Sequence, residues 1–188
     1  MWIHKCLNYI KVCLAGLFAL SFSITASAEV APLIKDKEER IAYNRSMEVE
    51  SNFIENWPQG PVINAASAIL MDAETGAILY AKNIHSQEYP ASTTKILTTL
   101  IAWENSSLDE IVSFSYDAVF NTPRDSNHIA MNPGDTLSME ECLNAILIRS
   151  ANEVSNAVAE HIAGKVDTFA EMMNARAKEL GCVDSHFA

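Results

Sequence analysis

Ser92 and Lys95 lie three residues apart in the stretch PASTTKILTTLIAW, in which Lys95 is the one charged residue. The stretch predicts a helix that begins at or near Ser92 and ends near Asn105, and residues three apart on a helix share a face. A lysine held beside a hydroxyl in a dry environment loses its charge more easily, because burial penalises the ammonium form. The neutral amine can accept the serine proton, so this pair has the chemistry of an activated nucleophile.

A purely structural explanation fits the same two residues. Ser92 would cap the helix, and Lys95 would extend its amine to solvent.

Most of the helix is expected to be buried, because its apolar residues cover more than one face. These residues are Ile96, Leu97, Leu100, Ile101 and Trp103.

A second polar pair, Ser150 and Asn152, lies between two predicted amphipathic helices at 139–149 and 153–163. An asparagine offers both a donor and an acceptor, so it can hold a neutral lysine and also bind a substrate amide. The serine can pass on a proton. The alternative is an ordinary cap at a helix junction, where both residue types are favoured.

The elements that position these pairs can be predicted from local patterns. Residues 66–82 have the pattern of a β-hairpin in which Gly76 takes the positive φ of the turn. Its near-continuous apolar strands predict a sheet covered on both faces. A short strand is expected at 111–114, and a helical turn at 115–120.

The last third of the chain predicts three helices, each bounded by residue types that favour helix ends. The first begins with a Ser-x-x-Glu capping box, and the third is predicted to begin with a Thr-x-x-Glu cap. The bounding residues are Ser138, Glu141, Gly164, Thr168, Glu171 and Gly181.

The start of the chain has the features of a secretory signal peptide over residues 1–28. Lys5 and Lys11 form a basic start, an apolar run follows, and Ala-Ser-Ala precedes Glu29. An uncleaved anchor is the alternative, although the apolar run is short for a membrane span. We therefore expect export. The whole chain carries a net charge of −11, so it would repel phosphates, and nucleic acid is excluded as a partner.

Two cysteines, Cys142 and Cys182, follow the predicted signal peptide. Outside the cytoplasm they could form a disulfide, but Cys142 falls on the apolar face of a helix, where a buried free thiol fits equally well. The histidines and cysteines lack the spacing of metal ligands. No metal and no cofactor is predicted.

The order and context of the two pairs resemble the penicillin-recognising serine acyltransferases, and most closely the D-alanyl-D-alanine carboxypeptidases. The resemblance extends over most of residues 62–188, after a charged lead-in at 29–61. It is carried by AASAILMDAETGAILYAKN, YPASTTKILTTLIAWEN, SNHIAMNPGD, LIRSANEVSNAVAEHIAG and FAEMMNARAKELGC. It implies a mixed α/β fold of the β-lactamase/transpeptidase type.

The resemblance also implies a mechanism. Ser92 would attack the carbonyl between the two terminal D-alanines of a peptidoglycan stem peptide, with Lys95 as general base. Asn152 would position Lys95 and the substrate amide, and Ser150 would relay a proton to the departing D-alanine. Water would hydrolyse the acyl-enzyme, and β-lactam antibiotics would act as inhibitors by acylating Ser92.

The sequence departs from the family pattern in one respect. The family carries a third motif, Lys-Thr-Gly or Lys-Ser-Gly, on a strand at the edge of the site, and none of the six glycines here follows that pattern. We therefore expect residues 62–188 to be the N-terminal part of the catalytic domain, with later sheet strands missing. The resemblance also implies that membrane contact is made only through a C-terminal anchor, which we expect to lie outside this sequence.

Two other functions remain as alternatives. A class A-like β-lactamase uses a Glu-x-x-Leu-Asn segment after the second motif, whereas the match here, 140–144, precedes Ser150. A truncated, inactive remnant or binding module would fit the missing third motif. A Ser-His-Asp hydrolase is disfavoured, since the chain has no Gly-x-Ser-x-Gly. His161 is expected to be an interior or half-buried histidine with no catalytic role.

Overall fold

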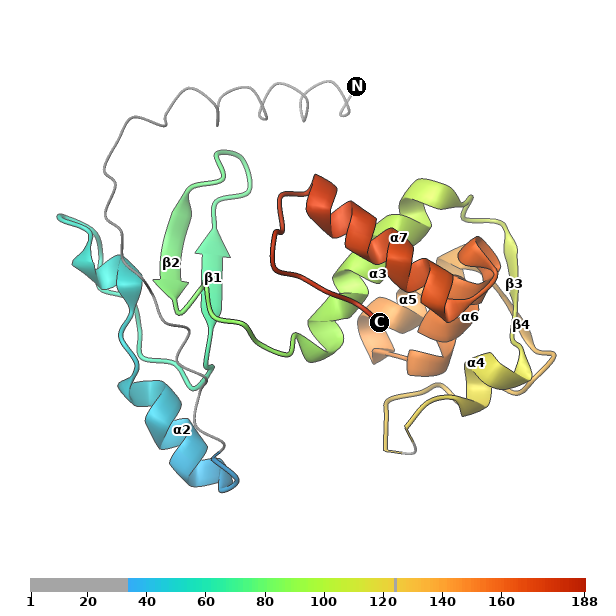
Figure 1. Cartoon of the computed structure of the whole chain (residues 1–188), viewed down its shortest axis with the longest axis horizontal. Helices are drawn as coiled ribbons and strands as arrows, with labels where there is room; N and C mark the ends of the chain where they lie inside the picture. The colour runs from blue at the N-terminus through green and yellow to red at the C-terminus, as the bar shows by residue number, and fades with distance from the viewer. Residues whose placement is uncertain (1–33, 124) are drawn as a thin grey trace. The chain divides into compact units, whose positions relative to one another are not determined.

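The computed structural model describes residues 34–123 and 125–188, so the predicted signal peptide lies outside the described residues. The described residues divide into two compact units, one that ends at residue 86 and one that begins at residue 87 (Figure 1). Across the described ranges, none of the helices combines the length and the apolar character needed to cross a membrane.

The first unit contains a β-hairpin and a short helix. Strands β1 and β2 pair antiparallel, with a register shift between Leu70 and Met71. The turn is held by Asp72, whose carboxylate accepts the Thr75 amide at 2.8 Å, and Gly76 takes a φ of +72°. The described elements are α2 (Lys37–Ser46), η1 (Glu50–Phe53), β1 (Ala68–Met71) and β2 (Ile78–Lys82).

The structure confirms the hairpin. Helix α2 forms in the charged lead-in, where the Asp36 carboxylate caps it by accepting the Glu39 amide at 2.8 Å. One expectation for this unit is wrong. The sheet is not covered on both faces in the described residues. Apolar continuity indicates what a strand can bury, but not what lies over it. The exposed strand side chains are Ile69, Leu70, Met71, Ile78 and Leu79.

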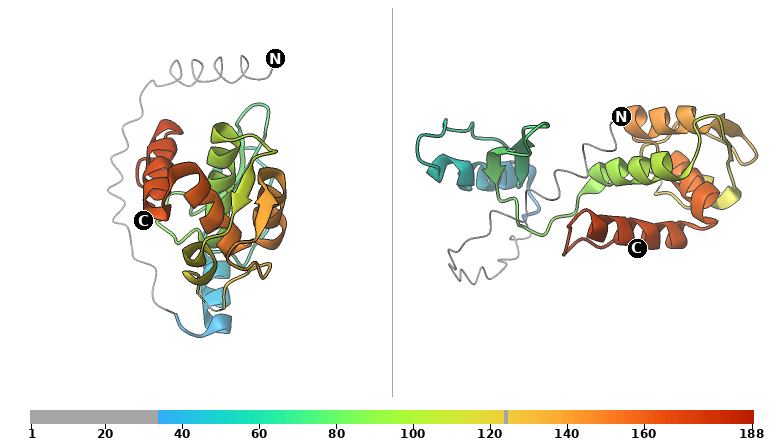
Figure 2. Two further views of the ribbon diagram at one scale, coloured as in Figure 1. Left: turned by 90° about the vertical axis from the view of Figure 1, so that its right-hand side faces the viewer. Right: turned by 90° about the horizontal axis from the view of Figure 1, so that it is seen from above.

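The second unit is mainly helical. Helix α6 lies at its centre and packs against α3, α4, α5 and α7, as the views in Figures 1 and 2 show. The short strands β3 and β4 pair antiparallel, with Val112 opposite Leu137. The elements are η2 (Ala91–Thr93), α3 (Thr94–Asn105), β3 (Ile111–Ser113), α4 (Tyr116–Phe120), β4 (Thr136–Ser138), α5 (Met139–Arg149), α6 (Asn152–Ala163) and α7 (Val166–Glu179).

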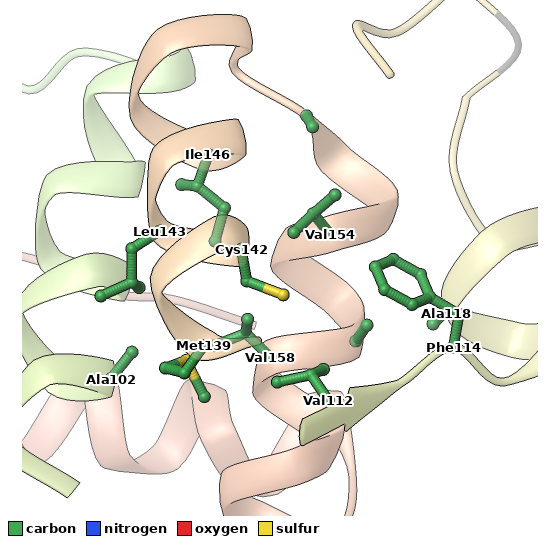
Figure 3. Packing of buried hydrophobic residues seen from close by; sticks show 12 residues of the cluster. Ala102, Val112, Phe114, Ala118, Met139, Cys142, Leu143, Ile146, Val154 and Val158 are labelled. Carbon is green, nitrogen blue, oxygen red and sulfur yellow. The ribbon is translucent and has the colours of Figure 1, made fainter. Parts of the chain in front are cut away.

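The hydrophobic core of this unit lies where α5 and α6 meet β3 and α4 (Figure 3). Each element contributes small or branched apolar side chains that are less than a tenth exposed, so the two helices that flank Ser150 are fixed against each other. The labelled members of this cluster are Ala102, Val112, Phe114, Ala118, Met139, Cys142, Leu143, Ile146, Val154 and Val158.

The predicted helix 139–149 and its capping box are confirmed, since Ser138 and Glu141 exchange the two expected hydrogen bonds. The cap at Thr168 is wrong. Helix α7 begins at Val166, and its N-cap, Lys165, makes no side-chain capping bond. The expected burial of α3 is only partly correct, because Ile96 and Trp103 are exposed by 67% and 62%.

The two described cysteines are free thiols, Cys142 buried and Cys182 exposed. A disulfide between them is therefore not formed. Burial raises the pKa of the Cys142 thiol to about 12, so this side chain stays protonated and acts as a small apolar residue in the core.

Candidate active site

Ser92 lies in the tight turn η2, immediately before α3. The Thr93 hydroxyl donates to the Pro90 carbonyl at 2.6 Å and stabilises this turn. The preceding residue, Ala91, has a φ of +47°, a left-handed conformation that side chains with a Cβ rarely adopt. The backbone is therefore strained next to the exposed Ser92 hydroxyl, as is common at functional sites.

Lys95 lies in the first turn of α3, with its amine between two partners. Its Nζ donates to Asn152 Oδ1 at 2.5 Å and to Ser92 Oγ at 3.5 Å. Burial lowers the pKa of the Lys95 ammonium group. The lysine therefore does not extend freely into solvent, and the sequence-based alternative of a solvated amine does not describe its position.

Ser150 ends α5 and takes a left-handed conformation, with φ +56° and ψ +34°. Its backbone amide donates to the Ala145 carbonyl, which closes the last turn of the helix. Glycine is the usual residue at such a position, so a serine there is conformationally costly. This turn directs the Ser150 hydroxyl to Ser92, and Ser150 Oγ donates to Ser92 Oγ at 2.8 Å.

Asn152 is the first residue of α6, two positions after Ser150. Its backbone amide donates to the Asn127 carbonyl at 2.9 Å, and its side-chain oxygen accepts the bond from Lys95. Asn152 is thus held by its backbone from one side and by Lys95 from the other.

The four predicted residues form one hydrogen-bonded chain, in the order Ser150, Ser92, Lys95, Asn152. All four belong to the second unit. Such a chain can move a proton from the Ser92 hydroxyl to a neutral amine on one side and exchange one with the Ser150 hydroxyl on the other. In the described ranges, no group of three or more histidine, cysteine or acidic side chains could hold a metal ion.

One residue next to these four hydrogen-bonded side chains was not singled out from the sequence. Glu153 follows Asn152 directly and is only 2% exposed. It lies in the first turn of α6, where acidic residues are common even on exposed helices because the helix dipole favours a negative charge there. The pattern of α6 places Val154, Ala157 and Val158 in the core, and no local feature marks Glu153 as buried.

The side chain of His161 is 26% exposed, and its Nε2 lies 2.8 Å from an oxygen of Glu110. This hydrogen bond is the main cause of a lowered pKa for the Glu110 carboxyl group, and the Ser107 amide adds to it. The position agrees with the expectation of a half-buried histidine. The pair ties α6 to the loop before β3.

Comparison with family models gives a match to D-alanyl-D-alanine carboxypeptidase over residues 54–188. The protein DacF of Bacillus subtilis, a D-alanyl-D-alanine carboxypeptidase, is 38% identical in an alignment of 131 residues that covers 65% of this chain and 32% of that protein. Escherichia coli DacD, with the same description, is 37% identical in an alignment of 138 residues that covers 69% of this chain and 36% of that protein. The chain spans about a third of the length of the curated relatives it matches.

Solved structures give the same result. Penicillin binding protein 6B from Escherichia coli matches with a TM-score of 0.64 and 35% identity, over 72% of this chain and 45% of that one. Penicillin binding protein 5 from Haemophilus influenzae also has a TM-score of 0.64, with 29% identity, over 70% of this chain and 40% of that one. The mixed α/β fold of the transpeptidase type is therefore confirmed, and the chain covers part of it.

Proposed function

Since this chain belongs to the family of D-alanyl-D-alanine carboxypeptidases, we propose that Ser92 is the nucleophile of a serine carboxypeptidase that removes the terminal D-alanine from peptidoglycan stem peptides. The observation that carries the proposal is the position of Lys95 Nζ between Ser92 Oγ and Asn152 Oδ1. The site is built from two segments that lie 57 residues apart in the sequence.

In the first step, Ser92 Oγ attacks the carbonyl carbon of the penultimate D-alanine. The hydroxyl proton passes to Lys95 Nζ, whose lowered pKa increases the fraction of neutral amine that can accept it. The tetrahedral intermediate then breaks its carbon–nitrogen bond. The departing D-alanine amine receives a proton through Ser150 Oγ, which lies 2.8 Å from Ser92 Oγ.

In the second step, water attacks the ester on Ser92 and releases the shortened peptide. Lys95 accepts a proton from this water, which restores the serine hydroxyl when the ester breaks. The backbone amide of Ser92, at the start of the α3 segment, is our candidate for one donor to the oxyanion, where the helix dipole adds to the stabilisation.

The partners follow from this reaction. The substrate is a peptide ending in D-Ala-D-Ala, and β-lactams acylate the same serine because they present a strained amide to the same groups. The reaction also implies export to the cell wall, outside the cytoplasm. We propose no nucleic-acid partner and no cofactor.

A class A-like β-lactamase is disfavoured by the position of its expected base. Glu140 lies in the first turn of α5, ten residues before Ser150 at the other end of the helix. At 1.5 Å per residue, the two positions are about 15 Å apart along the axis. Glu140 is therefore too far from the Ser92 turn to orient a water molecule there by direct contact.

The proposal is tested with the full chain and a short peptide ending in D-Ala-D-Ala. We expect release of D-alanine, its inhibition by penicillin, and loss of both release and penicillin labelling in Ser92→Ala. Rapid, repeated penicillin hydrolysis without D-alanine release would favour the β-lactamase. Absence of both release and labelling in the wild-type chain would favour a non-catalytic binding module.

A further inference from the structure

Glu153 is a buried carboxylate with an incomplete set of hydrogen bonds. Its Oε1 accepts the backbone amide of Ile129 at 2.6 Å. Its Oε2 is also buried and has no hydrogen-bond partner among residues 34–123 and 125–188. A buried polar atom without a partner lowers stability, which offsets part of what the bond to Ile129 contributes.

A second hydrogen bond lies next to the bond between Glu153 and Ile129. One residue before Glu153, the backbone amide of Asn152 donates to the carbonyl of Asn127 at 2.9 Å. Two hydrogen bonds therefore join the segment 127–129 to the first two residues of α6. The Ile129 side chain also packs against the core cluster of this unit, which provides a third anchor for the segment.

One of these two bonds, the bond to the Asn127 carbonyl, takes the place of the cap that α6 lacks. The N-cap residue, Ala151, has no side chain that could bind the free amides at the helix start, and the Asn127 carbonyl satisfies one of them. The residue after this segment, Ala130, has a φ of +63°, so the loop turns sharply just after Ile129. The position of Asn152 therefore depends on a loop that Glu153 holds in place.

We propose that Glu153 is a positioning residue for the Ser92 site. By binding the Ile129 amide it fixes the 127–129 segment, this segment fixes the backbone of Asn152, and Asn152 Oδ1 then lies within 2.5 Å of Lys95 Nζ. The proposal rests on the function proposed above, in which Lys95 takes the proton of Ser92. The simpler role, a favourable charge at the helix N-terminus, does not require the bond to Ile129.

Three variants separate these roles. Glu153→Met keeps the size and removes the acceptor, Glu153→Gln keeps a side-chain oxygen for the Ile129 amide, and Glu160→Met is the control on the same helix. NMR of the full chain measures amide hydrogen exchange at Ile129, Asn152 and Val158. The side-chain amide resonances of Asn152 are compared with those in Lys95→Met, where the bond to the lysine is lost.

In Glu153→Met we expect exchange at Ile129 and Asn152 to become faster by about tenfold, as for loss of a charge-assisted bond, with exchange at Val158 unchanged. The Asn152 side-chain resonances should shift toward their positions in Lys95→Met. Glu153→Gln should restore both features, and Glu160→Met should change neither. Penicillin acylation should fall by up to about 100-fold in the chemical step of Glu153→Met, as expected for an approximately 1 Å displacement.

Two results would overturn the proposal. One is an unchanged Asn152 side-chain signal in Glu153→Met, and the other is an equal loss of protection at Val158, which would indicate general destabilisation. The wild-type chain gives a further test that needs no variant, because Ile129 should exchange far more slowly than its exposed neighbour His128. Since these signals do not depend on penicillin, failure of the wild-type chain to be acylated would count against the function and not against this role of Glu153.

Discussion

Two lysines, one in each unit, differ in what their amines bind. Lys82, at the end of β2, is only 1% exposed, and its Nζ donates to three backbone carbonyls, those of Asn44, Ile63 and Ala65, at 2.6, 3.1 and 2.8 Å. Lys95 is half-buried and donates to one amide oxygen and one hydroxyl. Burial lowers the pKa of both ammonium groups, so the pKa shift alone does not distinguish them.

The difference between the two sites lies in the acceptors. An ammonium group has three donors, and the three carbonyls around Lys82 satisfy all of them without being able to give a proton back. The Ser92 hydroxyl can both accept from Lys95 and donate to it. A buried lysine is therefore structural where its partners are carbonyls, and it can take part in proton transfer where a partner carries its own proton.

The largest effect should follow from Lys95→Met. Removal of the proton acceptor should slow acylation of Ser92 by penicillin by about 10³-fold, within the range for loss of a general base. Stopped-flow fluorescence with a labelled penicillin measures this rate. Lys178→Met, at an exposed position on α7, is the control and should react like the wild type. A comparable rate in Lys95→Met would refute the proposed role of the lysine.

Lys82→Met should lower the stability of the first unit and leave the acylation rate unchanged. The variant leaves three carbonyls of the first unit without their donor, and we expect a loss of about 3 kcal/mol in the free energy of unfolding of that unit. Urea unfolding, monitored through hydrogen exchange of the β2 amides, measures this loss of stability. Lys37→Met, exposed on α2, is the matched control. If Lys82→Met were as stable as this control, the carbonyl cage would not be the structural support described above.

The pH dependence of the acylation rate should reflect the ionisation of Lys95. Because burial lowers its pKa, the neutral amine appears at a lower pH than for an ordinary lysine with a pKa of about 10.4. The acylation rate should therefore rise about tenfold per pH unit below the lowered pKa and level off above it. A plateau already present at pH 6, or a midpoint at or above the ordinary lysine value, would contradict this assignment.

The smallest effect concerns the left-handed residue at the end of α5. Ser150→Gly should relieve the strain at φ +56° and raise the free energy of unfolding by about 1 kcal/mol. Ser150→Ala removes the same hydroxyl but keeps a Cβ, so the difference between the two variants isolates the strain. Equal melting temperatures for the two variants would show that serine is not strained at this position.

Where local chemistry decides the structure, the sequence was sufficient. Ser138 and Glu141 form a capping box from residues three apart, and α5 has the predicted bounds. The start of α2 could have been recognised in the same way, since Asp36 precedes Glu39 at capping distance. The error at Thr168 has a related cause. Its Thr-x-x-Glu pattern matched a cap, but the N-cap of α7 is Lys165, three residues earlier, and it makes no side-chain capping bond.

The features that were not predicted depend on contacts between distant residues. Strand β4 has three residues, and it is defined by its pairing with β3 rather than by its own composition. Glu153 is buried because Ile129, 24 residues earlier, presents an amide to it. The four site residues were found because their spacing matches a known family pattern. Spacing alone did not show that Ser150 reaches Ser92 through a strained turn.

The central claim, that Ser92 is the residue acylated through Lys95, is tested most directly by mass spectrometry of the full chain after reaction with penicillin. We predict one covalent adduct of the antibiotic, located by peptide mapping on Ser92, absent in Ser92→Ala and formed about 10³-fold more slowly in Lys95→Met. An adduct that persists in Ser92→Ala, or a wild-type chain that remains unmodified, would contradict it.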